Sequence, residues 1–341
     1  MSHMQQQLGQ VLTQCAKTYG AKGWRRENPV KLRDVLIGLR RDFSIESSKR
    51  GSELAESFSS CAKLVRRHDY NGYLCTLALP KHLHPAAFAA RAFNVESVQA
   101  IESTKEVAIA RMRLAFWRDT MKDVYKGAPT SHPVARALQK VVEIAHPPKR
   151  WFDQIIDTRI EDLLRHAPYA DMPSLEKYVE GTSASLLYIQ LHAIGVQSTA
   201  ADHAASHIGK AAGLATLLRG TAHLASRRQC YLPADLLMKH GVSQESVYRG
   251  EASEALAEVV FECATAAKAH LDHGRKLKST VPNAAFPILL PSVQTELYLN
   301  ALEKCNFNVF DASLAHGSRS DAMRQLHAQV SIGWYSWQGT Y

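Results

Sequence analysis

The chain has 341 residues and a formal net charge of +9, from 41 Lys and Arg against 32 Asp and Glu. Hydrophobic residues make up 46% and charged residues 21%, a composition that excludes wholesale disorder and a polytopic membrane protein. The positive balance favours an anionic partner, such as nucleic acid, acidic lipid or a phosphorylated ligand. A basic, solvated surface without any partner explains the same charge equally well.

The first residues, MSHMQQQLGQ, lack a cationic stretch followed by an apolar run, so no secretory signal is visible. Residues 1–57 are polar and carry scattered Arg and Lys, and we expect them to form an N-terminal extension that is partly helical or disordered. Residues 58–341 are expected to form one large helical domain.

Ala, Leu, Glu and Arg dominate from Glu53 onward and prolines fall between segments, which predicts an all-α fold. The expected helices are 53–68, 70–78, 84–101, 104–126, 131–145, 149–166, 173–195, 200–225, 233–240, 243–248, 252–279, 283–289, 292–303 and 320–336. The residues Ser103-Thr104-Lys105-Glu106 and Met172-Pro173-Ser174-Leu175-Glu176 resemble capping arrangements. The uncharged run 181–201 contains enough polar residues to favour a buried core helix over a membrane span.

The six cysteines lie far apart and include no Cys-x-x-Cys pair. This spacing predicts reduced, mostly buried thiols rather than a disulfide framework or a zinc site.

Three carboxylates follow one another at four-residue intervals: Asp153, Asp157 and Glu161. This spacing places them on one helical face, where they could chelate magnesium. Arginines are interleaved with them, however, and this favours a solvated stripe of charge.

Two histidine pairs are spaced about one helical turn apart, His203 with His207 and His270 with His273. Neither pair has an evident third ligand, and neither belongs to a His-Glu-x-x-His motif. Capping or packing is therefore the favoured role, and we assign no metal ligand.

Familiar nucleotide and hydrolase signals are missing, because the chain has no GxxxxGK[ST] loop, no GxSxG elbow and no GxGxxG after a strand. Aromatic residues are not interleaved with basic ones, which argues against nucleic acid as the partner. We assign no catalytic residue.

The most informative window lies between Asp202 and Asp235, where the chain has four Lys or Arg and no carboxylate. On a helix, Arg219 and His223 stack on one face, and Arg227 follows at the same interval. The pattern predicts a cationic stripe.

Residues 208–237, IGKAAGLATLLRGTAHLASRRQCYLPADLL, resemble the second signature of squalene and phytoene synthases. That signature is an Asn-x-x-Arg-Asp type motif followed by an Arg-x-Tyr-Leu-Pro segment. Arg219 keeps the motif arginine, whereas Thr216 and Gly220 replace its asparagine and aspartate. His223 stands where a further acid would be, and the segment around Tyr231 matches the following Tyr-Leu-Pro.

The first family signature has a counterpart in FAARAFNVESVQAIE, followed by RMRLAFWRDTMKDVYKG. Its aspartate-rich motif is replaced by Val98, Gln99 and Glu102, so at most one carboxylate remains. Asn94 and Glu96 are the other polar groups of that helix.

The resemblance implies a prenyl-synthase fold, and enzymes of this kind hold magnesium mainly with carboxylates. Because the second helix supplies none, we expect the pocket to be catalytically degenerate and to need no cofactor. The candidate ligand-binding residues are Asn94, Glu96, Glu102, Arg219, His223, Arg227, Arg228 and Tyr231.

Two alternatives remain open. The chain is a surviving transferase for an isoprenoid or other diphosphate, with magnesium as cofactor and Glu96, Glu102 and the Arg219 stripe as its site. Or Arg219, Arg227 and Arg228 are structural and pair with Asp157, Glu161 or Asp162, because buried arginines need partners.

The string DHAASHIGKA, which begins at Asp202, is similar to one branch of the family, the assembly factors of mitochondrial NADH dehydrogenase (complex I). This resemblance implies early action on complex I assembly intermediates, near the membrane subunit ND-one. It implies a peripheral location on the matrix side of the mitochondrial inner membrane, where anionic lipid is a further expected partner. The aromatic C-terminus, with Trp334, Tyr335, Trp337 and Tyr341, either anchors the protein at the interface or, as we favour, packs against the helical body.

Overall fold

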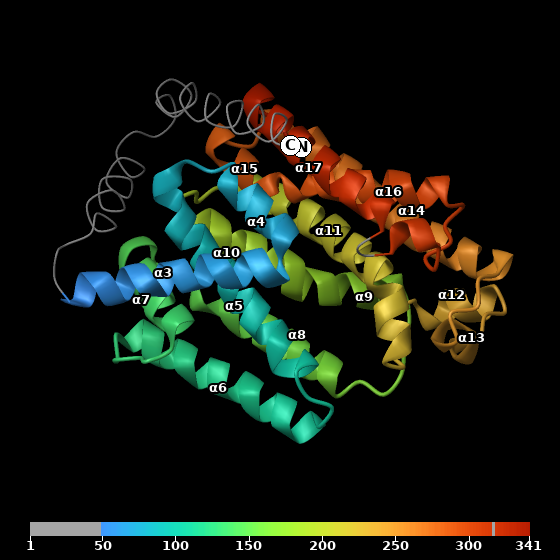
Figure 1. The fold of residues 1–341 in the computed structure, drawn as a ribbon, viewed down its shortest axis with the longest axis horizontal. Helices are drawn as coiled ribbons and strands as arrows, with labels where there is room; N and C mark the ends of the chain where they lie inside the picture. Colours follow the sequence, from blue (N-terminus) through green and yellow to red (C-terminus); the bar gives the residue numbers. More distant parts are fainter. Residues whose placement is uncertain (1–48, 316–317) are drawn as a thin grey trace.

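A computed structural model describes residues 49–315 and 318–341, and this part of the chain contains helices and no strand (Figure 1). The all-α fold class is therefore confirmed. Its α-helices are α3 (Lys49–His68), α4 (Tyr70–Leu77), α5 (His84–Glu102), α6 (Val107–Lys126), α7 (Pro133–Ala145), α8 (Lys149–Leu163), α9 (Met172–Val179), α10 (Ser185–Ala193), α11 (Thr199–Ser226), α12 (Ala234–Lys239), α13 (Gln244–Tyr248), α14 (Glu254–Lys276), α15 (Phe286–Leu289), α16 (Pro291–Lys304) and α17 (Arg319–Gln338).

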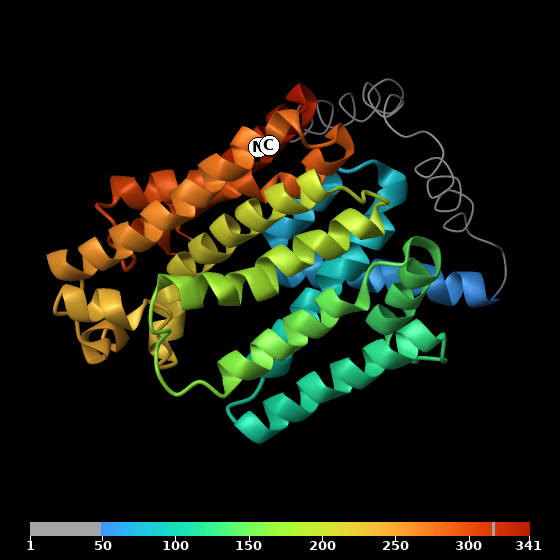
Figure 2. The same ribbon diagram turned by 180° about the vertical axis from the view of Figure 1, so that it is seen from behind.

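The longer helices form a row. Seen from behind, α6, α8, the α9–α10 pair, α11 and α14 lie side by side in chain order (Figure 2). Helix α5 contacts α6, α7, α8 and α10, and α3 packs on α5 and α7. Helix α16 packs on α11 and α14. Helix α11 therefore lies among neighbours on several sides.

Two large apolar clusters form the core. One surrounds α11 and α14, and the other is built from α5, α6, α7 and α8, where Phe93 and Phe152 are fully buried. Tyr188 of α10 packs against both clusters. This shared contact joins the two halves of the described chain into one packed body.

Short polar side chains mark where several helices begin. Asp171 caps α9 through a reciprocal capping box with Ser174. Ser198 and Ser253 each accept a backbone N–H bond in the first turn of α11 and α14. The predicted start at residue 104 is wrong, because Thr104 accepts from the backbone N–H of Glu106 instead and the helix begins at Val107.

The predicted helix 173–195 contains a π-helical segment, Glu180–Ala184, between α9 and α10. Glu180 holds this segment to α11, because its carboxylate accepts from Ser206 Oγ at 2.8 Å and lies 3.5 Å from Lys210 Nζ. The wider turn is a feature that hydrophobic periodicity does not reveal. The expectation that the run from 181 forms a buried core helix is confirmed by the burial of most of α10.

The expected boundary between residues 57 and 58 falls inside α3, a continuous helix from Lys49 to His68. Residues 1–48, which make up most of the expected N-terminal extension, lie outside the described residues. The described residues contain five cysteines. All five are free and all but Cys305 are buried, as their spacing predicts.

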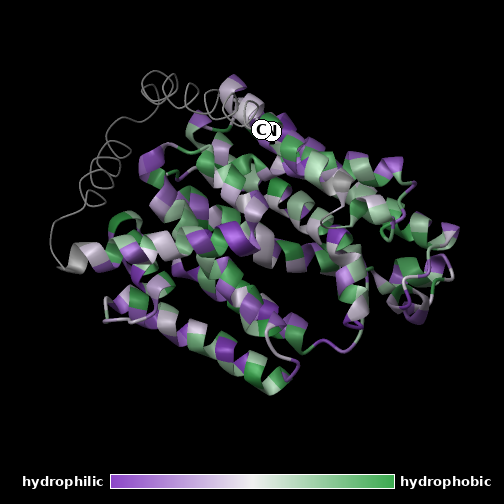
Figure 3. Cartoon of the chain, in the orientation of Figure 1, coloured by the Kyte–Doolittle hydropathy of each residue, from purple (hydrophilic) through white to green (hydrophobic). Residues whose placement is uncertain are grey.

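Hydrophilic and hydrophobic residues alternate along the helices (Figure 3). In the described part of the chain, no helix is sufficiently long and apolar to span a bilayer.

Glycine allows α11 to approach the π-helical segment closely. A Cβ atom on Gly209 would lie 2.4 Å from the backbone Cα of Ala184, a contact that side-chain rotation cannot relieve. A Cβ atom on Gly220 of the same helix would meet only Leu224, at 3.4 Å. The two positions therefore differ in packing although both are helical.

We predict opposite effects of one added methyl group at these positions. Gly209→Ala should lower the free energy of unfolding by about 1–3 kcal/mol because it overpacks the contact. Gly220→Ala should raise it by about 0.5–1 kcal/mol, since alanine loses less backbone entropy in a helix. Urea denaturation followed by circular dichroism measures both. Equal effects would contradict the close contact between α11 and Ala184.

Candidate functional site

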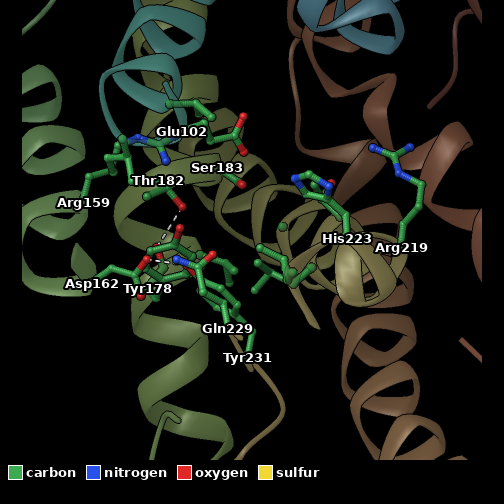
Figure 4. Close-up of a pocket in the computed structure, with 18 of the residues that line it drawn as sticks. Glu102, Arg159, Asp162, Tyr178, Thr182, Ser183, Arg219, His223, Gln229 and Tyr231 are labelled. Carbon is green, nitrogen blue, oxygen red and sulfur yellow. Dashed lines mark hydrogen bonds between the residues drawn. The ribbon is translucent and has the colours of Figure 1, made fainter. Parts of the chain in front are cut away.

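A cavity of about 1100 Å³ opens between α5, α8, α9, the π-helical segment, α11 and the turn after α11 (Figure 4). Thr182 and Ser183 of the π-helical segment line it, so the wider turn forms part of its wall. On one side of the view lie Asp162, Tyr178 and Tyr231, and on the other lie His223 and Arg219. The cavity is the candidate functional site.

The lining of the cavity is positively charged. Seven Lys and Arg residues contribute to it, against four Asp and Glu. The cations are Arg91, Lys105, Arg159, Arg165, Arg219, Arg227 and Arg228, and the acids are Asp69, Glu102, Glu106 and Asp162. This balance favours an anionic ligand.

The Asp162 carboxylate accepts hydrogen bonds from three side chains, which occupy most of its capacity to bind a ligand. The hydroxyls of Tyr169 and Tyr231 donate to it, as does Arg165 Nε at 3.1 Å. The Arg165 guanidinium also lies over both tyrosine rings, 4.3 Å and 4.9 Å from their centroids. Burial raises the pKa of Tyr231, and the neighbouring Tyr178 and Asp162 raise it further. Tyr231 is therefore a neutral hydrogen-bond donor that fixes Asp162.

Two buried arginines line the cavity, Arg91 from α5 and Arg159 from α8. Arg91 donates to Asp69 at 2.9 Å, and Arg159 donates to the side-chain oxygen of Asn94 at 2.8 Å. The two residues are only 6% and 8% exposed, and the buried Nε atom of each has no hydrogen-bond partner among the described residues. Both side chains line the cavity and add positive charge beside α5 and α8.

The predicted stripe on α11 faces the cavity, where Arg219 and His223 are lining residues. Arg219 is exposed and forms no ion pair within the described part of the chain. Arg227 donates to the backbone oxygen of Glu102 at 3.3 Å, and Arg228 pairs with Glu245 at 2.8 Å. The stripe therefore comprises one arginine without a carboxylate partner and two that bind neighbouring elements.

The structure brings seven of the eight candidate ligand-binding residues to this cavity, all except Glu96. Glu102 lies at its rim and is exposed, whereas Glu96 is half-buried and lies 4.0 Å from His132 Nε2. Burial raises the pKa of Glu96. Glu96 and Glu102 thus occupy different environments and do not form a pair across the cavity.

The partners expected for structural arginines are different from those found. Asp157 pairs with Arg118 of α6, and Asp153 pairs with Lys149 at 2.6 Å. Asp162 pairs with Arg165 rather than with an arginine of the stripe. The arginines of the α11 stripe therefore take none of these carboxylates, because Asp153 and Asp162 pair within α8 or the residues just after it and Asp157 pairs with α6.

Sequence reasoning missed Asp69, Arg91, Arg159 and Tyr178 as lining residues. Arg159 and Asn94 are 65 positions apart, and no local pattern joins them. Arg159 follows Ile155 and Ile156 by about one helical turn, and both isoleucines are fully buried. An arginine at this spacing from two isoleucines is the sequence signal that would have identified it.

The two histidine pairs meet between α11 and α14. Each of His203, His207 and His273 offers a ring nitrogen within 4.8 Å of the others, and this is the only such metal-ligand group among residues 49–315 and 318–341. The sequence shows no third ligand beside either pair, and the structure brings His273 of α14 beside the two histidines of α11 from a distant part of the sequence. None of these histidines lines the cavity.

The aromatic C-terminus divides between core and surface. Tyr341 is buried and donates to the backbone oxygen of Gly274, and Tyr335 packs against the apolar cluster of α4 and α16. Trp334 and Trp337 are 54% and 48% exposed and lie against each other. The favoured expectation of packing against the body holds for the tyrosines, whereas the two tryptophans keep about half of their surface exposed.

Comparison with known proteins identifies the family of this chain. The family model for squalene/phytoene synthase matches residues 65–321. The human protein "NADH dehydrogenase (ubiquinone) complex I, assembly factor 6" is 41% identical over 281 residues, which cover 82% of each chain. Its homolog from Drosophila melanogaster is 39% identical and covers 77% of this chain and 79% of its own length. The structure of a dehydrosqualene synthase in complex with ligand has a TM-score of 0.72 at 18% identity, and covers 84% of this chain and 99% of that one. The chain belongs to the squalene/phytoene synthase family.

Proposed function

We propose that this protein is a non-catalytic assembly factor for mitochondrial respiratory complex I. The observation that carries the proposal is its 41% identity, across 82% of both chains, to a human protein named as a complex I assembly factor. The family match, over residues 65–321, includes every residue that lines the cavity, so the family resemblance extends to the candidate site.

The finer part of the proposal concerns place and partners. We propose early action at the matrix face of the inner membrane, on assembly intermediates that include the membrane subunit ND-one. Peripheral contact with anionic lipid is supported by the formal charge of +9 and by the exposed Trp334–Trp337 pair on α17. Tryptophan is favoured at the boundary between headgroups and acyl chains, and each basic residue near such a surface contributes about 1 kcal/mol.

We further propose that the cavity is a degenerate prenyl-synthase pocket that needs no metal. The carboxylates that line the cavity support this. Asp69 and Asp162 already bind arginines, and α11 contributes no carboxylate to the lining. Glu102 and Glu106 are left at the rim, and the described carboxylates of the cavity do not form a metal-ligand group. A magnesium cluster normally requires several carboxylates, so these residues do not fit one.

An anion can bind this cavity directly. Among the described residues Arg219 has no carboxylate partner, and Arg91 and Arg159 also line the cavity. Guanidinium groups bind phosphate and carboxylate oxygens with charge-assisted hydrogen bonds. A phosphorylated or carboxylated ligand is therefore the class that the cavity favours.

A second candidate function is transfer chemistry on an isoprenoid or other diphosphate with magnesium. The shared fold with a dehydrosqualene synthase and the exposed Glu102 at the rim favour it. If the protein is a transferase, Glu102 acts as a metal ligand. The assembly role does not require such a ligand.

The assembly role predicts rescue by the chain in human cells that lack the 41%-identical relative. Wild-type protein should restore complex I activity, and Glu102→Ala should restore it equally. Arg219→Glu should weaken the rescue several-fold because it reverses the charge facing the cavity. Arg111→Glu on the exposed surface of α6 is the matched control. Complex I activity and assembly are read by in-gel assay, and failure of the wild-type chain would contradict the role.

Turnover of farnesyl and geranylgeranyl diphosphate separates the two candidate functions. We expect diphosphate binding without turnover, equally with and without magnesium. Binding should be about 10–150-fold weaker in Arg219→Ala, because one charged hydrogen bond contributes about 1.5–3 kcal/mol. Calorimetry measures binding, and product analysis measures turnover. Magnesium-dependent turnover that is lost in Glu102→Ala would establish the transferase instead.

Vesicle flotation tests the membrane contact. Binding to cardiolipin-containing vesicles should exceed binding to neutral ones and should fall as salt rises. The Trp334→Ala, Trp337→Ala double variant should bind several-fold more weakly, whereas Phe116→Ala, which removes a 51% exposed ring from α6, should not. Equal binding of the two variants would rule out α17 as the contact.

A further inference from the structure

Four histidines meet where α11 packs on α14, on a surface outside the cavity. His203 and His207 stand one turn apart on α11, and His270 and His273 stand on the facing side of α14. The ring centroids of His207 and His273 are 4.1 Å apart, and those of His203 and His273 are 5.9 Å apart. The two helices thus contribute two histidines each to one cluster.

Close packing of the helices produces this cluster. Gly274 follows His273, and a Cβ atom there would lie 2.6 Å from Cδ1 of Ile208 and 3.4 Å from Cβ of His207. The absence of a side chain at Gly274 makes room for the Ile208 side chain between the two helices. The cluster is therefore fixed by buried packing, although His203 and His273 themselves are exposed.

We propose that His203, His207 and His273 bind one zinc ion, with a water molecule as the fourth ligand. One ring nitrogen of each lies within 4.8 Å of those of the others. Tetrahedral zinc with bonds of about 2.0–2.1 Å needs nitrogens about 3.4 Å apart. Small rotations of the two exposed rings close this difference. A site of neutral imidazoles with no carboxylate among them suits zinc rather than magnesium or calcium.

His270 and Glu176 orient the central ligand. His207 Nδ1 lies 2.9 Å from His270 Nδ1, and His270 Nε2 lies 3.3 Å from a carboxylate oxygen of Glu176. Glu176 accepts only, so His270 carries its proton on Nε2 and accepts at Nδ1. His207 must then donate from Nδ1, and this leaves the lone pair of its Nε2 free for the metal. Partners of this kind fix the tautomer of a metal-binding histidine.

Positive charge beside the cluster is offset. Lys210 stands one turn beyond His207, and its Nζ lies 3.5 Å from Glu180. Glu176 adds a second carboxylate behind His270. A divalent cation therefore enters a region with two carboxylates and one lysine.

Zinc titration of the untagged full-length chain tests the site. Calorimetry should show one saturable equivalent of Zn²⁺, and Co²⁺ should give the intense visible absorption of tetrahedral coordination. The His203→Ala, His273→Ala double variant should lose both signals. His327→Ala, which removes an exposed histidine of α17, should keep both.

A positioning variant makes the test sharper. His270→Ala should keep the stoichiometry of one but bind zinc about 10–100-fold more weakly, because it removes the group that orients His207. The exposed positions of His203 and His273 make their double variant safe for folding, and its unchanged melting temperature without metal verifies this. Absence of a saturable equivalent in the wild-type chain, or equal zinc binding by the double variant, would overturn the proposal.

Discussion

The close packing of α11 against its neighbours is the constraint on which the rest of the structure depends. Gly209 lets α11 touch the π-helical segment on one side, and Gly274 lets α14 touch α11 on another. One face of α11 therefore contributes to the cavity wall while a different face carries two histidines into the cluster with α14. A displacement of this one helix would alter both regions together.

The two sides of the cavity differ in how their charged side chains are held. On the α8 side, Asp162 accepts from two tyrosine hydroxyls and from Arg165, and these bonds hold it in place. On the α11 side, Arg219 has no such partner among the described residues and is free to turn toward a ligand. A pocket that is fixed on one side and adjustable on the other suits retention of an anion, whereas a metal-dependent reaction needs several acids held in place.

Local sequence patterns predicted most of the fold, because apolar periodicity and prolines mark helices directly. The positions of α5, α8 and α11 follow from such patterns. The family resemblance added the cavity residues Arg219, His223 and Tyr231, which composition alone could not have placed together. The start of α6 was missed because a threonine that resembles a cap instead closes the preceding turn.

Other features depend on contacts between distant residues and have no local signature. The pairing of Arg159 with Asn94 joins α8 to α5, and the meeting of His207 with His273 joins α11 to α14. The exposed face of α17 is likewise a property of packing, because the sequence shows four aromatic residues and does not show which of them the body covers. Such features required the three-dimensional arrangement.

The π-helical segment has a consequence for how a single helical rod serves two environments. A turn closed by i→i+5 bonds inserts one residue without adding a full turn, so residues after it are out of phase by about 100° with those before it. Tyr178 of α9 lines the cavity, Leu186 of α10 lines it and also belongs to the apolar cluster around α5, and Ile189 belongs to that cluster. The change of phase therefore lets a single rod line the binding site along one stretch and continue into the apolar core along the next.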